Sequence, residues 1–160
     1  MKPADCPPLA LGEALESLAA MPGFLAQALA EAGDATRRAA DGGFSLLEHA
    51  CHLRDLEREG YLLRVKRLLA ETSPVLAGFP GDRIAQERDY RSQDAPAACA
   101  DFARARAELV SLVRGLGEDE LCREGEFAGR RVTLADVVLM AAGHDAEHRA
   151  DIGRLLHDPS

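Results

Sequence analysis

Residues 134–157 read LADVVLMAAGHDAEHRADIGRLLH, and this stretch decides the fold class. Side chains spaced three and four positions apart share one face of a helix. One such face is lined by Leu134, Val137, Ala141, His144, His148, Asp151 and Leu155. The preceding Thr133, with Asp136 three residues later, is typical of a helix N-terminus. The stretch therefore predicts a long helix whose inward face carries two histidines one turn apart.

The remaining sequence has the same helical character. Alanine, leucine, arginine and glutamate dominate it, whereas β-branched and aromatic residues are scarce, and this composition favours helix over strand. Ser45 and Glu48 form a capping box, and Asp94 precedes a helix with Pro96 in its first turn. With their caps included, the four long helices are expected at residues 9–32, 45–70, 94–114 and 133–157.

These helices predict an all-α fold, a four-helix bundle in a single domain that spans residues 1–160. One or two short extra helices are expected in the connections, at residues 82–90 and 118–121. Residues 72–81 and the remainder of 115–131 contain several glycines and are expected to be loops. The sequence leaves the order in which the helices pack open.

The composition limits the class of protein. Hydrophobic residues make up 47% of the chain and charged residues 29%, as in an ordinary globular protein. The net charge is −8 and the arginines are interspersed with acids, which argues against an extended nucleic-acid contact. No apolar run approaches the roughly 20 residues that cross a bilayer, and we expect a cytoplasmic protein. Its cysteines lie far apart and are expected to be reduced; they are Cys6, Cys51, Cys99 and Cys122.

A third histidine, His52, is expected to face the same core from the second helix. At about 100° per residue it lies about 40° from Leu56 and about 20° from Leu63, so it points inward. Metal sites in bundles are built from side chains on facing helices. We therefore predict a metal site made of His52, His144 and His148. Three nitrogen ligands would leave positions open for water or substrate, as in a catalytic site.

Several nearby residues are assigned supporting roles. Asp55 and Asp151 each follow a predicted ligand by three residues, and we expect them to hydrogen-bond the imidazoles and fix their tautomers. His49 is expected to be a core or rim residue, and Cys99 and Cys122 to be buried small hydrophobic residues. No residue stands out as a general base. The candidates are Glu48, Asp55, Glu59 and Glu147.

Two blocks of the sequence resemble a known protein family. Residues 43–49, GFSLLEH, with HLRD at residues 52–55, resemble the second helix of the DinB-like proteins. Residues 129–134, GRRVTL, followed by His144 and His148, resemble the lead-in to their final helix and that helix itself. The resemblance covers most of the chain.

The resemblance implies a function as well as a fold. DinB-like proteins, also called YfiT-like metalloenzymes, are four-helix bundles that carry a divalent metal on three histidines, which correspond to His52, His144 and His148 here. Related members act with low-molecular-weight thiols such as bacillithiol or mycothiol, and homodimers are usual. The chain departs from the family at Phe44, where tryptophan is common, and at Glu126, where many members have a histidine before the last helix.

We therefore expect a metal-dependent enzyme of the thiol S-transferase type. A divalent ion (Zn, Ni, Fe or Mn) would activate a low-molecular-weight thiol cofactor or water for attack on a small electrophilic molecule. The expected partners are that small-molecule substrate and a second copy of the chain in a homodimer, with no nucleic acid and no membrane. Two alternatives remain open. One is a non-catalytic, metal-stabilised stress-response or interaction protein; the other is an interaction module without metal, whose histidines pair with Asp55 and Asp151.

Overall fold

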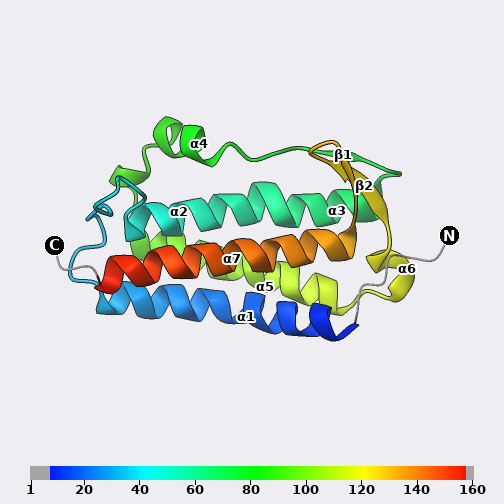
Figure 1. Ribbon diagram of the computed structural model, residues 1–160, viewed down its shortest axis with the longest axis horizontal. Coiled ribbons are helices and arrows are strands. Elements are labelled where there is room, and N and C mark those ends of the chain that lie inside the picture. Colours follow the sequence, from blue (N-terminus) through cyan, green and yellow to red (C-terminus); the bar gives the residue numbers. More distant parts are fainter. Residues whose placement is uncertain (1–7, 158–160) are drawn as a thin grey trace.

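The computed structural model describes residues 8–157, with side chains from residue 10 onward. The predicted all-α four-helix bundle is confirmed (Figure 1). Its helices are α1 (Pro8–Glu31), a continuous second helix made of α2 (Leu46–Leu56), one π-helical turn η1 (Glu57–Tyr61) and α3 (Leu62–Ala70), then α5 (Ala95–Arg114) and α7 (Leu134–His157). Cys6, for which a reduced thiol is expected, lies outside the described residues.

Helices α2 and α5 begin at the caps that the sequence predicts. At the start of α2, the Ser45 hydroxyl accepts a hydrogen bond from the backbone N–H of Glu48, and the Glu48 carboxylate accepts one from the N–H of Ser45. At the start of α5, the Asp94 carboxylate accepts a hydrogen bond from the N–H of Ala97. Pro22 lies inside α1 without ending it.

The connection between α3 and α5 determines how the helices pack. It crosses back along the length of the bundle, so α5 starts at the same end as α2 and the two run parallel (Figure 1). Around the bundle, α1 packs against α5 and α7, while α2 packs closely against α5 and more loosely against α7. The crossing segment carries α4 (Gly81–Glu87) and a 3-10 turn, η2 (Tyr90–Ser92), over α2. These elements and α6 (Glu118–Leu121) are the short helices expected in the connections.

A small three-stranded sheet lies at one end of the bundle, where loops were expected. β1 (Val75–Leu76) pairs in parallel with β2 (Glu124–Phe127), and β2 pairs in antiparallel fashion with β3 (Arg130–Thr133). Ala128 and Gly129 both have positive φ and form the two-residue turn of this hairpin. The expectation of loops was incomplete because strands of two to four residues carry almost no periodic signal.

The π-helical turn changes which residues of the second helix face inward. A π turn takes in one more residue than an α turn, so α3 is rotated relative to α2. His52 and Leu56, which precede the π-helical turn, are buried, whereas Leu63, which follows it, is 46% exposed. The inward direction of His52 was therefore correct, although Leu63 was a wrong marker for it.

A layer of buried charge divides the core. Arg106 of α5 donates hydrogen bonds to the carboxylates of Glu57 in η1 (2.9 Å) and Asp145 in α7 (2.6 Å), and to the backbone carbonyl of Leu18 in α1 (3.0 Å). Each of these three charged residues is at most 2% exposed. The buried apolar residues form two clusters, one on either side of this layer. Arg106 thus ties all four helices together at one level, a network that the sequence analysis did not predict.

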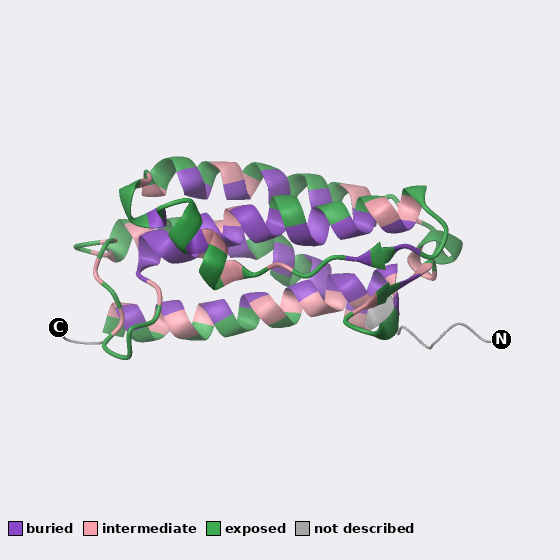
Figure 2. Cartoon of the chain, turned by 90° about the horizontal axis from the view of Figure 1, so that it is seen from above, coloured by how far each residue is buried: buried purple, intermediate pink, exposed green. Residues whose placement is uncertain are grey.

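Burial follows the inward faces of the helices, whereas the crossing segment with α4 is largely exposed (Figure 2). Within residues 8–157, no helix has the length and apolar character that crossing a bilayer requires.

Candidate metal centre

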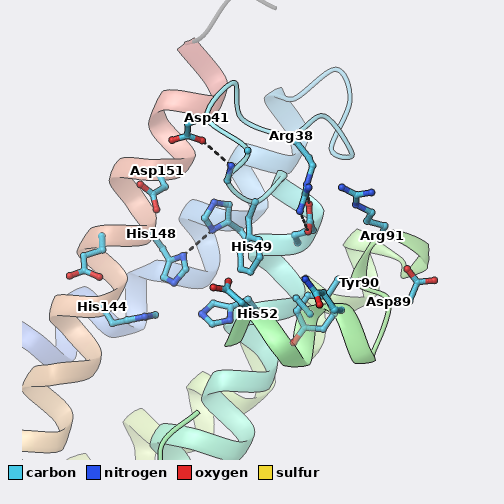
Figure 3. A pocket seen from close by; sticks show the side chains of 18 residues that line it. Arg38, Asp41, His49, His52, Asp89, Tyr90, Arg91, His144, His148 and Asp151 are labelled. Carbon is cyan, nitrogen blue, oxygen red and sulfur yellow. Dashed lines mark hydrogen bonds and ion pairs between the residues drawn. The ribbon is translucent and has the colours of Figure 1, made fainter. Parts of the chain in front are cut away.

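The three predicted ligands form one cluster between two antiparallel helices. His52 of α2 lies opposite His144 and His148 of α7, and one nitrogen of each ring lies within 4.8 Å of the others (Figure 3). The ring centroids are 4.5 Å apart for His144 and His148, and 5.0 Å apart for His52 and His148. The structure brings these residues together as the helix faces predicted; that they bind a metal stays a prediction.

Burial keeps the three imidazoles neutral near pH 7. Together with the neighbouring histidines, it lowers the pKa of His52 to about 4 and that of His148 to about 2. Burial also lowers the pKa of His144, which is half-buried. Neutral imidazole is the form that coordinates metal ions. The cluster is therefore in the protonation state that a metal site needs.

Two nitrogens of the cluster have unused hydrogen-bonding capacity. Nδ1 of His52 and Nδ1 of His144 are buried and have no hydrogen-bond partner among the described residues. Most buried polar atoms in native proteins do have a partner. Orphaned imidazole nitrogens in a group of three neutral rings fit a bound cation better than a packed core.

The crossing segment closes over His52. Gly81, the first residue of α4, comes so near that a Cβ atom there would lie 2.7 Å from Cε1 of His52. The rings of Phe44 and Phe79 flank His52, with centroids 5.5 and 5.9 Å from that of the imidazole. His52 is thereby shielded on several sides by residues outside its own helix.

A cavity of about 1000 Å³ adjoins the cluster and opens to solvent. Its walls come from the loop before α2, from α2, from the crossing segment and from α7 (Figure 3). Phe44 contributes aromatic surface, Tyr90 lies buried behind the wall, and most charged lining residues are acidic. The acids are Asp41, Glu48, Asp82, Asp89, Glu147 and Asp151, and the bases are Arg38 and Arg91. The size is that of a small-molecule site.

His49 contacts the cluster directly. Its Nδ1 lies 2.9 Å from Nδ1 of His148, and burial lowers the pKa of His49 to about 4. His49, His148 and Asp151 form a second group whose potential ligand atoms all lie within 4.8 Å. His49 is buried, as expected of a core residue, but it also lines the cavity and touches a predicted ligand.

The expectation that Asp55 and Asp151 hydrogen-bond the ligand histidines is wrong for both residues. The Asp55 carboxylate makes no hydrogen bond to His52; it accepts hydrogen bonds from the Tyr90 hydroxyl (2.6 Å) and from Arg54 Nε (2.8 Å). Asp151 pairs with Arg154 instead of His148. A carboxylate one turn along a helix has many possible partners, and here guanidinium and hydroxyl donors hold it.

Three of the four candidate bases are bound to arginines, and the fourth is free to accept a proton. Glu48 and Glu59 are held by Arg38 (3.0 Å) and Arg88 (2.6 Å), and Asp55 by the contacts above. Glu147 is exposed and lines the cavity. Glu126, at the position where family members often have a histidine, lies on β2 and does not line the cavity.

The cysteines with described side chains lie away from the cavity lining. Cys51 and Cys99 are buried, and burial raises the pKa of the Cys51 thiol to about 11. The expectation that Cys99 is buried is confirmed, whereas Cys122 is only half-buried. None of these thiols is placed to act as a nucleophile at the histidines.

The chain matches the model of the DinB superfamily over residues 13–152. Its fold is similar to that of YfiT from Bacillus subtilis, described as a probable metal-dependent hydrolase with an unusual four-helix bundle topology. The two chains are 21% identical with a TM-score of 0.86, over 97% of this chain and 91% of YfiT. No curated protein matches significantly. Because the family model covers most of the sequence, this chain belongs to the DinB superfamily.

Proposed function

We propose that the protein is a divalent-metal-dependent enzyme whose ion is held by His52, His144 and His148. The observation that carries this proposal is the position of three neutral imidazoles beside an open cavity of about 1000 Å³. The similarity to YfiT, described as a probable metal-dependent hydrolase, supports it. By ligand type, three imidazoles suit Zn, Ni, Fe or Mn.

The bound ion would lower the pKa of a water molecule or thiol held beside it, and so supply a nucleophile at neutral pH. We propose that this nucleophile attacks a small electrophilic molecule in the cavity. In S-transfer the sulfur of a low-molecular-weight thiol would form a C–S bond as a halide leaves or an epoxide C–O bond opens, and in hydrolysis water would split an ester into an acid and an alcohol. No described cysteine side chain lines the cavity, so the thiol would be a diffusible cofactor.

The side chains around the cavity would bind the substrate and exclude water. Phe44 offers aromatic surface to it, and Phe44 with Phe79 shields the His52 ring. Glu147 is the candidate to accept a proton at its carboxylate, because it is exposed to the cavity while Glu48 is held by an arginine.

Reconstitution of activity tests this proposal. Protein stripped with a chelator and reloaded with each of the four ions would be assayed on an activated ester, an epoxide and an aryl halide, with and without added thiol. We expect turnover only with metal, and its loss in His148→Ala but not in His157→Ala, since His157 is exposed at the end of α7. Turnover that requires thiol indicates a transferase, and turnover without it a hydrolase.

Metal binding without turnover on any substrate would contradict the enzymatic part of the proposal. The non-catalytic alternative, in which the ion staples α2 to α7, would then explain the site. It predicts a larger fall in melting temperature on chelation than an open catalytic site does, because the binding free energy would contribute directly to folding.

A further inference from the structure

His49 lies beside the cluster without being one of the three proposed ligands. Its Nδ1 is 2.9 Å from Nδ1 of His148, and the two rings are nearly perpendicular, at 87°. His49 is only 3% exposed, and the ring of Phe44 packs edge-on against it with centroids 5.6 Å apart. Packing therefore holds the two imidazoles in this contact.

The contact restricts where the protons can be. Two ring nitrogens at hydrogen-bond distance share one proton, and a neutral imidazole carries one proton in all. If His49 donated, neutral His148 would carry its own proton on Nε2 and would have no lone pair left for a metal. If His148 donates from Nδ1, its Nε2 lone pair is free. Only the second arrangement lets His148 act as a ligand.

We propose that His49 is a positioning residue: its Nδ1 accepts the Nδ1–H of His148 and so fixes the tautomer and ring orientation that present Nε2 of His148 to a metal. This inference rests on the proposed metal site. Histidine ligands almost always donate their second ring N–H to an acceptor, and loss of that acceptor weakens metal binding. The carboxylates expected in this role, Asp55 and Asp151, are bound elsewhere, and an imidazole takes their place.

Asp151 lies next to both histidines of the pair and supports this arrangement. Its carboxylate lies within 4.8 Å of a nitrogen of His49 and of a nitrogen of His148. The negative charge of Asp151 favours the arrangement in which His49 accepts the N–H of His148, because the acceptor ring becomes slightly more positive when it accepts a hydrogen bond. The same three residues could also hold a second ion, so the number of bound ions must be measured.

Co²⁺ binding to variants of His49 tests the inference. His49→Leu removes the acceptor and keeps apolar bulk, whereas His49→Asn keeps an oxygen acceptor near the position of Nδ1. His157→Asn at the exposed end of α7 is the matched control. We expect one equivalent of Co²⁺ in every protein, with affinity about 10- to 100-fold lower and an altered visible spectrum in His49→Leu. His49→Asn and His157→Asn should remain close to wild type.

Three results would overturn the inference. The first is wild-type affinity and spectrum in His49→Leu. The second is an equal loss in His49→Leu and His49→Asn, since the acceptor would then not matter. The third is two equivalents in the wild type and one in His49→Leu, which would make His49 a ligand. If circular dichroism shows that His49→Leu does not fold, His49→Met takes its place, because its flexible side chain fills irregular gaps.

Failure of the metal site itself gives a different result. A wild-type protein that binds no Co²⁺, or a His144→Ala variant that binds it as the wild type does, would contradict the site, and the role of His49 would fall with it. Loss of binding in His144→Ala together with unchanged binding in His49→Leu would contradict the role of His49 alone.

Discussion

At the scale of single residues, Gly81 is the point where the crossing segment comes closest to the histidines. A Cβ atom at this position would lie 2.7 Å from Cε1 and 3.0 Å from Nδ1 of His52. Real Cβ atoms essentially never approach another atom so closely, so either the His52 ring or the start of α4 would have to move. Each of these movements displaces a proposed ligand or its cover.

We expect Gly81→Ala to weaken metal binding and to lower the free energy of unfolding by about 1–3 kcal/mol, the usual cost of overpacking. Gly78→Ala is the matched control, because Gly78 lies in the same segment and its added Cβ would meet nothing within 4 Å. Co²⁺ titration and urea unfolding of both variants measure these effects. Equal behaviour of the two variants would contradict the close contact.

The candidate site was predictable from the sequence only in part. The inward direction of His52, His144 and His148 follows from helix periodicity, which sequence alone determines. The hydrogen-bond partners do not follow, because they depend on residues brought from other elements. Asp55 accepts a hydrogen bond from Tyr90, which is 35 positions away in the sequence, and His148 contacts His49 on the opposite helix.

At the scale of elements, the Arg106 layer is the contact that joins all four helices. Its guanidinium holds the carboxylates of Glu57 and Asp145, one on η1 and the other next to His144 on α7. Burial raises the pKa of Glu57, although Arg106 opposes this shift. A single substitution that removes Arg106 would leave two buried carboxyl groups without their cation.

Arg106→Met is therefore expected to lower the free energy of unfolding by about 3–5 kcal/mol, the range for breaking a buried ion pair. Arg104→Met is the control: Arg104 pairs with Asp101 but is exposed, and exposed pairs contribute about 0–1 kcal/mol. Urea unfolding followed by circular dichroism compares the two. A loss in Arg106→Met no larger than in Arg104→Met would show that the layer does not stabilise the bundle.

The long helices were predicted from the sequence, whereas the small sheet was not, because helix caps are local and strand pairing is not. The starts of α2, α5 and α7 follow from local caps such as Ser45 and Asp94, whose hydrogen bonds lie within a few residues. The sheet depends on contacts between distant segments, such as Val75 with Glu126. Arg106 had a signal that was overlooked, since it lies on the apolar face of its helix with Phe102 and Leu109.

At the scale of the whole molecule, metal binding should stabilise the bundle, because the ligands come from two helices that otherwise pack loosely. An ion at about 100 times its Kd adds about 2.7 kcal/mol, which raises the melting temperature of a protein of this size by roughly 5–11 °C. Thermal unfolding with and without chelator measures the shift. His144→Ala should show none, and an equal shift in that variant would place the ion elsewhere.

The homodimer is a prediction from the resemblance to the DinB-like family. Light scattering coupled to size-exclusion chromatography is expected to give the mass of two chains. The mass of a single chain, unchanged over a range of protein concentrations, would contradict it.

The most direct test of the metal centre is the metal content per chain, measured by elemental mass spectrometry on the wild type, His52→Ala, His144→Ala and His157→Ala. A site shared by α2 and α7 predicts about one equivalent in the wild type and in His157→Ala, and its loss in both other variants. No metal in the wild type after incubation with divalent ions, or one equivalent retained in His52→Ala and His144→Ala, would contradict the three-histidine site.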